Sequence, residues 1–258
     1  LGHSDLFNPY KEVLSPHFNI HTPLFSGHGN TALPQGGITM EQYTAELNAY
    51  CTQQGLEEVH LFGHSMGGYV ALYYALQQPG RVQSVMTLGT KFDWTEEQAT
   101  KESKMLNPDA ILEKVPKYAA QLEAQHGSQW KALLPAIADM MIGLGKKPIL
   151  QSQNLSTLNL PVQIMLGDKD NMVSMEESMQ VYRSIPEARF AVLPDTKHPM
   201  DRVRPQLVLD LMKDYWSLKK MIIQILQRGG HDPARCCIYC STLYQSLNSH
   251  YLESRRTI

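Results

Sequence analysis

Hydrophobic and polar positions alternate between two kinds of segment over residues 18–92. Short apolar runs with strand-like composition occur at FNIHTPLF (18–25), VHLFG (59–63) and VQSVMTLG (82–89). Helix-like stretches separate them, one over residues 40–54 and one that begins at Met66. Strands that alternate with helices favour a parallel sheet covered on both faces, so we expect an α/β fold.

The pattern changes between residues 95 and 158. Helix-forming stretches dominate there, and they are broken at Pro108, Pro116, Gly127 and Pro148 without a convincing β run. A helical block inside an α/β chain is typical of an inserted cap or lid. We therefore predict a helical cap over residues 95–158.

The strand pattern returns after this block. Apolar runs occur at PVQIMLGD (161–168) and ARFAVLPD (188–195), and helices are expected over 174–184 and 204–216. We predict that residues 1–94 and 159–216 form one α/β core. The tail, residues 217–258, shows no sustained periodicity, and we expect it to be an atypical and disordered appendage.

Composition narrows the classes of partner. The 258-residue chain is 43% hydrophobic and 19% charged, with a formal net charge of -2. The length and the hydrophobic fraction suit a domain with one sizeable core. The slightly negative net charge gives no positive potential that would attract nucleic acid or an anionic membrane. A membrane-spanning helix needs about 18 or more consecutive apolar residues, and the sequence contains no such run. We expect a small-molecule partner and no stable membrane insertion, with the oligomeric state open.

Cysteine usage bears on the compartment. Three of the four cysteines, Cys236, Cys237 and Cys240, lie in one short segment of the tail, which does not resemble a disulfide framework. A structural zinc site needs four ligands, and one Cys-x-x-Cys pair with His231 nearby does not supply a second pair of ligands. We expect a cytoplasmic protein, although a chain that begins with Leu1 leaves a lost signal peptide open.

The segment GHSMG (63–67) lies between a strand-like and a helix-like stretch. A Gly-x-Ser-x-Gly sequence in that context is typical of a nucleophile elbow, in which the serine occupies a strained turn. Ser65 is the candidate nucleophile, and Gly63 and Gly67 keep side chains out of the space where the backbones nearly touch. The Met66 N–H, at the start of the helix, is expected to donate to an oxyanion. The alternative is an ordinary turn matched by chance.

A serine hydroxyl needs a base to take its proton and a carboxylate to orient that base. Loops after the two later strands supply both in the chain order Ser, Asp, His. His198 is the candidate base. Asp170 is the preferred acid, because it lies further beyond its strand than Asp168, which we assign to bracing the turn. Whether Asp168 can replace Asp170 stays open, and Asp195 is assigned to a turn.

Together these motifs resemble the α/β-hydrolase superfamily, particularly its lid-bearing bacterial serine esterases and lipases of the monoacylglycerol-lipase-like type. GHSMGG is similar to the family's elbow, FSGHG to the loop after its fourth strand, GDKDNMV to its acid loop and KHPM to its histidine loop. The resemblance covers about residues 1–216. It implies Ser65 as nucleophile, Asp170 as acid and His198 as base. His64 and Met172 are expected to contact the substrate.

The family's second oxyanion donor follows a third strand that ends in His-Gly. By the resemblance, Leu1 and Gly2 are remnants of that loop, and the strand itself is missing. The third strand lies between the fourth and the fifth, so its loss would leave a central gap with unpaired backbone groups. We therefore expect an N-terminally incomplete sequence, and we assign no functional part to the tail.

The expected activity is hydrolysis of a small or acyl carboxylic ester through an acyl-enzyme, which requires no cofactor and no metal. The same triad can cleave a C–C bond or an amide, and a non-catalytic ligand-binding member of the fold is the alternative from another class. Methionines and leucines of residues 95–158 can line an acyl pocket, but such side chains more often pack a cap onto the sheet. The substrate and its chain length stay open.

Overall fold

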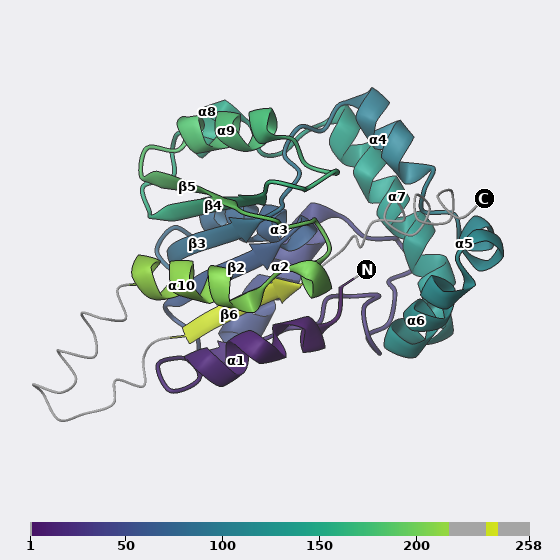
Figure 1. The fold of residues 1–258 in the computed structure, drawn as a ribbon, viewed down its shortest axis with the longest axis horizontal. Helices are drawn as coiled ribbons and strands as arrows, with labels where there is room; N and C mark the ends of the chain where they lie inside the picture. Colours follow the sequence, from purple (N-terminus) through teal and green to yellow (C-terminus); the bar gives the residue numbers. More distant parts are fainter. Residues whose placement is uncertain (1, 217–235, 242–258) are drawn as a thin grey trace, which may run out of the picture.

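The computed structural model describes residues 2–216 and 236–241. Its core is a six-stranded sheet in the order β1-β6-β2-β3-β4-β5, and every neighbouring pair runs parallel (Figure 1). The strands are β1 (Asn19–His21), β2 (Val59–His64), β3 (Val82–Leu88), β4 (Val162–Gly167), β5 (Ala188–Leu193) and β6 (Cys236–Ser241). The predicted α/β class is confirmed.

Helices cover both faces of this sheet. They are α1 (Asn8–Leu14), α2 (Met40–Gln53), α3 (Met66–Gln77), α9 (Met175–Ser184) and α10 (Pro205–Tyr215). In Figure 1, α1 and α10 lie on the near face, and α2 and α3 lie behind it. Neighbouring residues of a strand point to opposite faces, so Val85 of β3 packs in the α2 and α3 cluster while Met86 packs in the α1 and α10 cluster. Burial on both faces explains the continuous apolar runs in the sequence.

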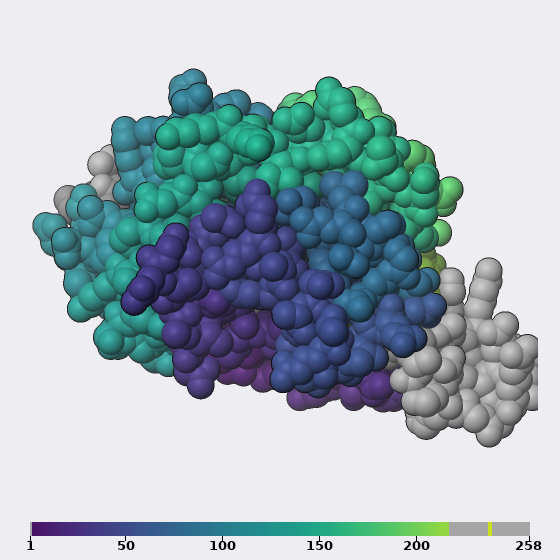
Figure 2. Space-filling view, turned by 180° about the vertical axis from the view of Figure 1, so that it is seen from behind, coloured from purple at the N-terminus to yellow at the C-terminus, as the bar shows by residue number. Residues whose placement is uncertain are grey.

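The segment between β3 and β4 contains no strand. Its helices are α4 (Glu96–Ser103), α5 (Pro108–Lys114), α6 (Pro116–His126), α7 (Trp130–Lys146) and α8 (Ser152–Leu155). Helices α4 to α7 gather at one end of the sheet, on the side toward which β6 points, and α4 packs on α7 (Figure 1). None of the helices within the described ranges is both long and apolar enough to cross a bilayer. The space-filling view from behind shows that α2 and this helical segment form one continuous surface (Figure 2).

The strand between β1 and β2 corrects one sequence-based expectation. Strand β6 comes from the tail and pairs with β1 on one side and β2 on the other. Its Cys237 packs in the cluster of α1 and α10, and its Ile238 packs in the opposite cluster. The expectations of a central gap and of a tail outside the fold are therefore wrong for residues 236–241, because two parallel ladders satisfy the backbone groups there. The rest of the tail, His231 included, lies outside the described residues.

Candidate active site

Ser65 occupies the sharp turn between β2 and α3. Its φ is 54° and its ψ is -123°, a conformation that costs a non-glycine residue about 1–3 kcal/mol. Two hydrogen bonds hold it there: the Ser65 N–H donates to the Leu88 carbonyl at 2.9 Å, and Thr90 Oγ1 donates to the Ser65 carbonyl at 2.9 Å. The end of β3 and the loop after it thus maintain a strained turn that presents the Ser65 hydroxyl at the carboxyl end of β2.

The same turn requires a glycine at position 63. A Cβ on Gly63 would lie 2.3 Å from the Gly67 carbonyl oxygen and 2.4 Å from the Gly68 nitrogen. Both neighbours are backbone atoms, so no side-chain rotation can relieve the clash. The close backbone approach that was predicted from the Gly63 and Gly67 spacing is present.

We expect Gly63→Ala to lower the free energy of unfolding by about 3 kcal/mol or more, because the added methyl group must push the elbow apart. Gly36→Ala is the matched control, since a Cβ there meets nothing within 4 Å. Chemical denaturation of both variants measures the difference. A Gly63→Ala protein as stable as the control would contradict this account of the elbow.

His198 and Asp170 reach Ser65 from the loops after β5 and β4. His198 Nε2 lies 3.2 Å from Ser65 Oγ, and His198 Nδ1 lies 2.8 Å from Asp170 Oδ2. A carboxylate oxygen accepts, so Nδ1 carries the proton and Nε2 is left to accept from the hydroxyl. The His198 and Asp170 side chains are only 1% and 2% exposed. The structure brings together the three residues that the sequence nominated.

Asp170 is held as an ionised acceptor. Its Oδ1 accepts from the backbone N–H groups of Met172 at 2.9 Å and Val173 at 3.0 Å. Burial by itself would raise the pKa of Asp170, but His198 and these two donors together lower that pKa below its usual value. At neutral pH Asp170 therefore remains a carboxylate facing the imidazole.

Asp168 has a different task in the same loop. Its Oδ1 accepts from the Thr196 N–H at 3.0 Å, and its backbone N–H donates to the Leu193 carbonyl at 3.0 Å. These bonds tie the loop after β4 to the loop that carries His198. Asp195 forms an exposed ion pair with Lys169 at a positive-φ turn. Asp168 thus braces the turn and does not contact the imidazole.

We expect Asp170→Asn to lower kcat for 4-nitrophenyl acetate by about 10⁴-fold, because an amide favours the wrong imidazole tautomer. Asp168→Asn is the matched change two residues earlier, and it should retain kcat within about tenfold, since an amide oxygen still accepts from Thr196. Steady-state kinetics on the two variants tests the assignment. Equal losses would remove the distinction between the two carboxylates.

Gly89 is a site residue that sequence reasoning missed. It follows β3 with φ +58°, and a Cβ there would lie 3.0 Å from Asp170 Oδ2 and 3.2 Å from His198 Nδ1. Glycine leaves space for the Asp170 and His198 pair to pass close to the end of β3. In the sequence, Gly89 is only a glycine directly after a predicted strand. Such glycines are common, so its place in the site could not be recognised before its distances to Asp170 and His198 were known.

His64 and Gly2 lie elsewhere than expected. The His64 Nε2–H donates to the His198 carbonyl at 2.8 Å, and burial followed by the nearby His198 lowers the pKa of His64 to about 3. His64 is thus a neutral group that positions His198, outside the cavity lining. Gly2 precedes His3, the N-cap of the 3-10 helix Ser4–Phe7, and also lies outside the lining, while Leu1 falls outside the described residues.

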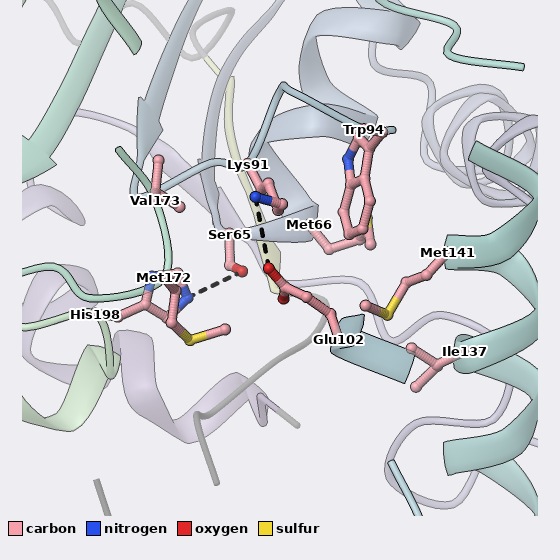
Figure 3. Close-up of a pocket in the computed structure, with 10 residues that line it drawn as sticks. All are labelled: Ser65, Met66, Lys91, Trp94, Glu102, Ile137, Met141, Met172, Val173 and His198. Carbon is pink, nitrogen blue, oxygen red and sulfur yellow. Dashed lines mark hydrogen bonds and ion pairs between the residues drawn. The ribbon is translucent and has the colours of Figure 1, made fainter. Parts of the chain in front are cut away.

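A cavity adjoins Ser65 and His198 (Figure 3). Apolar side chains form most of its wall, namely Met66, Trp94, Ile137, Met141, Met172 and Val173. The expected substrate-facing position of Met172 agrees with this lining. Two charged side chains, Lys91 and Glu102, also line it. In the part of the chain that the structure describes, no three His, Cys, Asp or Glu side chains are grouped to hold a metal ion.

Comparisons with known proteins agree with this architecture. The family described as the alpha/beta hydrolase fold matches residues 1–116. Lipase 3 of Moraxella sp. strain TA144 is 24% identical over 240 residues, which cover 84% of this chain and 74% of the lipase. Monoacylglycerol lipase ABHD6 of Homo sapiens is 22% identical over 243 residues, with 83% and 72% covered. A structure of a thermophilic esterase from Thermogutta terrifontis aligns with a TM-score of 0.64 at 22% identity, covering 84% of this chain and 86% of the esterase.

Proposed function

Because the chain is an α/β-fold hydrolase of the esterase and lipase type, we propose that it hydrolyses a carboxylic ester through Ser65, His198 and Asp170. The observation that carries the proposal is the hydrogen-bond chain from Ser65 Oγ through the imidazole to the Asp170 carboxylate. This chain of hydrogen bonds begins at a serine held in a strained strand-to-helix turn. Enzymes that transfer acyl groups use this combination of an exposed serine and an oriented base.

The geometry supports a two-step route. His198 Nε2 takes the hydroxyl proton while Ser65 Oγ attacks the ester carbonyl, and the imidazolium then gives that proton to the leaving alcohol. In the second step Nε2 takes a proton from water, the resulting hydroxide attacks the acyl-enzyme, and the acid leaves as Ser65 regains its proton. Asp170 keeps Nδ1 protonated and stabilises the imidazolium in both steps.

The negative charge on the carbonyl oxygen needs a donor. Met66 is the first residue of α3, where a backbone N–H has no partner within the helix and the helix dipole favours an anion. We assign the Met66 N–H as one oxyanion donor, a contribution of about 3 kcal/mol to transition-state stabilisation.

We also propose that residues 95–158 form a cap over this site. Ile137 and Met141 of α7 and Glu102 of α4 line the cavity beside Ser65. A cap that supplies these walls excludes water from the acyl group and sets which substrates reach Ser65.

Labelling of the full chain with a fluorophosphonate probe, followed by mass-spectrometric mapping, tests the proposed nucleophile. We expect one adduct, at Ser65, that a simple ester such as 4-nitrophenyl butyrate suppresses by competition. A folded protein that takes no label would favour a non-catalytic ligand-binding role. A panel of an ester, a dienoic diketone and an aminoacyl anilide then separates the chemistries, and faster turnover of the diketone or the anilide would contradict an esterase.

A further inference from the structure

Lys91 places a cation against the apolar part of the cavity. Its side chain is 14% exposed, and Nζ lies 5.7 Å from the centre of the Trp94 ring. The nearest carboxylate oxygens are Glu102 Oε1 at 3.5 Å and Glu177 Oε1 at 3.9 Å. Both distances exceed those of a full hydrogen bond between an ammonium and a carboxylate. The Lys91 ammonium can therefore accommodate a closer acceptor.

Glu177 is not free to become that acceptor. Its Oε2 accepts from the backbone N–H groups of Phe92 at 3.0 Å and Asp93 at 2.9 Å. Its Oε1 accepts from the Ser174 N–H at 2.7 Å, as part of the capping box of α9. These bonds fix the carboxylate and brace the loop that carries Lys91. Glu177 would have to give them up to move closer to the ammonium.

Glu102 is the movable partner. It lies in the last turn of α4, and its carboxylate points toward Lys91 and the space in front of Ser65 (Figure 3). Burial raises the pKa of Glu102, and the charge of Lys91 offsets only part of that rise. The free space that remains in the cavity is about that of one water molecule. An acyl group therefore needs more room beside Ser65, and a movement of the Glu102 side chain out of the cavity wall would provide it.

We propose that Lys91 binds a carboxylate group of the substrate, and that the Glu102 carboxylate takes this place while the site is empty. The preferred substrates are esters that carry a free carboxylate, such as the hemi-esters of dicarboxylic acids. This inference rests on the proposed ester hydrolysis by Ser65, and it names the class of ester.

The preference follows from what the Lys91 ammonium loses when Glu102 leaves. A nearly buried cation that is separated from its counter-ion is strongly destabilised. A substrate carboxylate restores the close pair at the same position, whereas an alkyl group of the same shape leaves the ammonium with only the fixed Glu177 carboxylate, 3.9 Å away. Among the residues that line the cavity, Lys91 is the permanent cation, so this discrimination depends on one side chain.

Matched esters test the proposal. Mono-4-nitrophenyl succinate, glutarate and adipate carry the carboxylate on the acyl side, and each is paired with the ester in which an isopropyl group replaces the carboxylate. Acetoxyacetate and 3-acetoxypropionate, paired with isobutyl and isopentyl acetate, carry it on the alcohol side. We expect kcat/KM for the best carboxylate ester to exceed that of its partner by about tenfold or more.

The readout is the ratio of kcat/KM within each pair. Lys91→Met should lower the ratio to about one, and Glu102→Gln should raise it, because the competing internal carboxylate is gone. Lys101→Met, an exposed lysine of the same helix as Glu102, is the control and should leave the ratio unchanged. If the Lys91→Met protein does not fold, the ratio of kcat/KM measured for Glu102→Gln still tests the proposal.

The outcomes separate this inference from the proposed function. Ser65-dependent hydrolysis without a carboxylate preference in either series would overturn the inference and leave the esterase standing. A preference that survives Lys91→Met, or that falls in Glu102→Gln, would also overturn it. A folded protein that hydrolyses neither series and takes no label at Ser65 would overturn both.

Discussion

Replacing Ser65 with alanine is expected to lower kcat for 4-nitrophenyl butyrate by about 10⁴- to 10⁶-fold without disturbing the fold. The Ser65 hydroxyl is the attacking atom, and its hydrogen bond to His198 is the only contact of the triad that the change removes. Steady-state kinetics and a far-UV circular dichroism spectrum measure the two effects. Ser156→Ala, at an exposed position remote from the cavity lining, is the matched control.

When two residues act together in one catalytic step, replacing both lowers kcat little more than replacing one of them. A double substitution therefore tests whether Ser65 and His198 act in the same step. Once Ser65 is alanine, a further His198→Ala change should lower kcat little more, because the base then has no hydroxyl to activate. An independent second loss of similar size would indicate that His198 serves a reaction that does not pass through Ser65. A Ser65→Ala enzyme with more than about a hundredth of the wild-type kcat would contradict the proposed nucleophile.

Replacing Ile238 with aspartate is expected to lower the free energy of unfolding by about 4 kcal/mol or more, a large part of the stability of an ordinary domain. Ile238 is fully buried in β6, an interior strand between β1 and β2, where a carboxylate would have no water. Strand β6 also pairs with β2, whose end carries Ser65, so ester hydrolysis should be lost as well. Chemical denaturation and near-UV circular dichroism report the change.

Val192→Asp provides the control for this substitution. Val192 lies in the edge strand β5 and is 41% exposed, so its aspartate stays hydrated and should cost about 1 kcal/mol or less. Ile238→Val, which removes one methylene group from the same buried site, should cost about 1 kcal/mol. If aspartate at position 238 were tolerated as well as at position 192, residues 236–241 would not form a buried strand between β1 and β2.

Much of the site could be predicted because its signals are local. The elbow needs a glycine two residues before and two residues after its serine, and both are visible in the chain around Ser65. Asp170 follows β4, which is buried along its whole length and reads as an apolar run. His198 follows the edge strand β5, which is only partly buried but still carries an apolar run before its loop. Parallel strands bring these loops to one edge of the sheet, so chain order was enough to nominate all three residues.

The cavity wall could not be predicted in the same way. Lys91 follows β3 and Glu102 lies on α4, and neither position carries a motif. The same holds for Gly89, whose role appears only when the Asp170 and His198 side chains are placed 3.0 and 3.2 Å from its missing Cβ. Contacts between elements depend on packing angles that no short window of sequence contains.

The sequence by itself determined the α/β class, the elbow and the chain order of serine, acid loop and histidine, because strand periodicity and turn chemistry act between near neighbours. Only the tertiary structure decided that Asp170 and not Asp168 faces the imidazole, since both lie on one loop and differ in which partner they meet. Only the tertiary structure placed residues 236–241 between β1 and β2. A parallel strand draws its stability from partners more than 170 residues away, so its own six residues carry little sign of where it will pair.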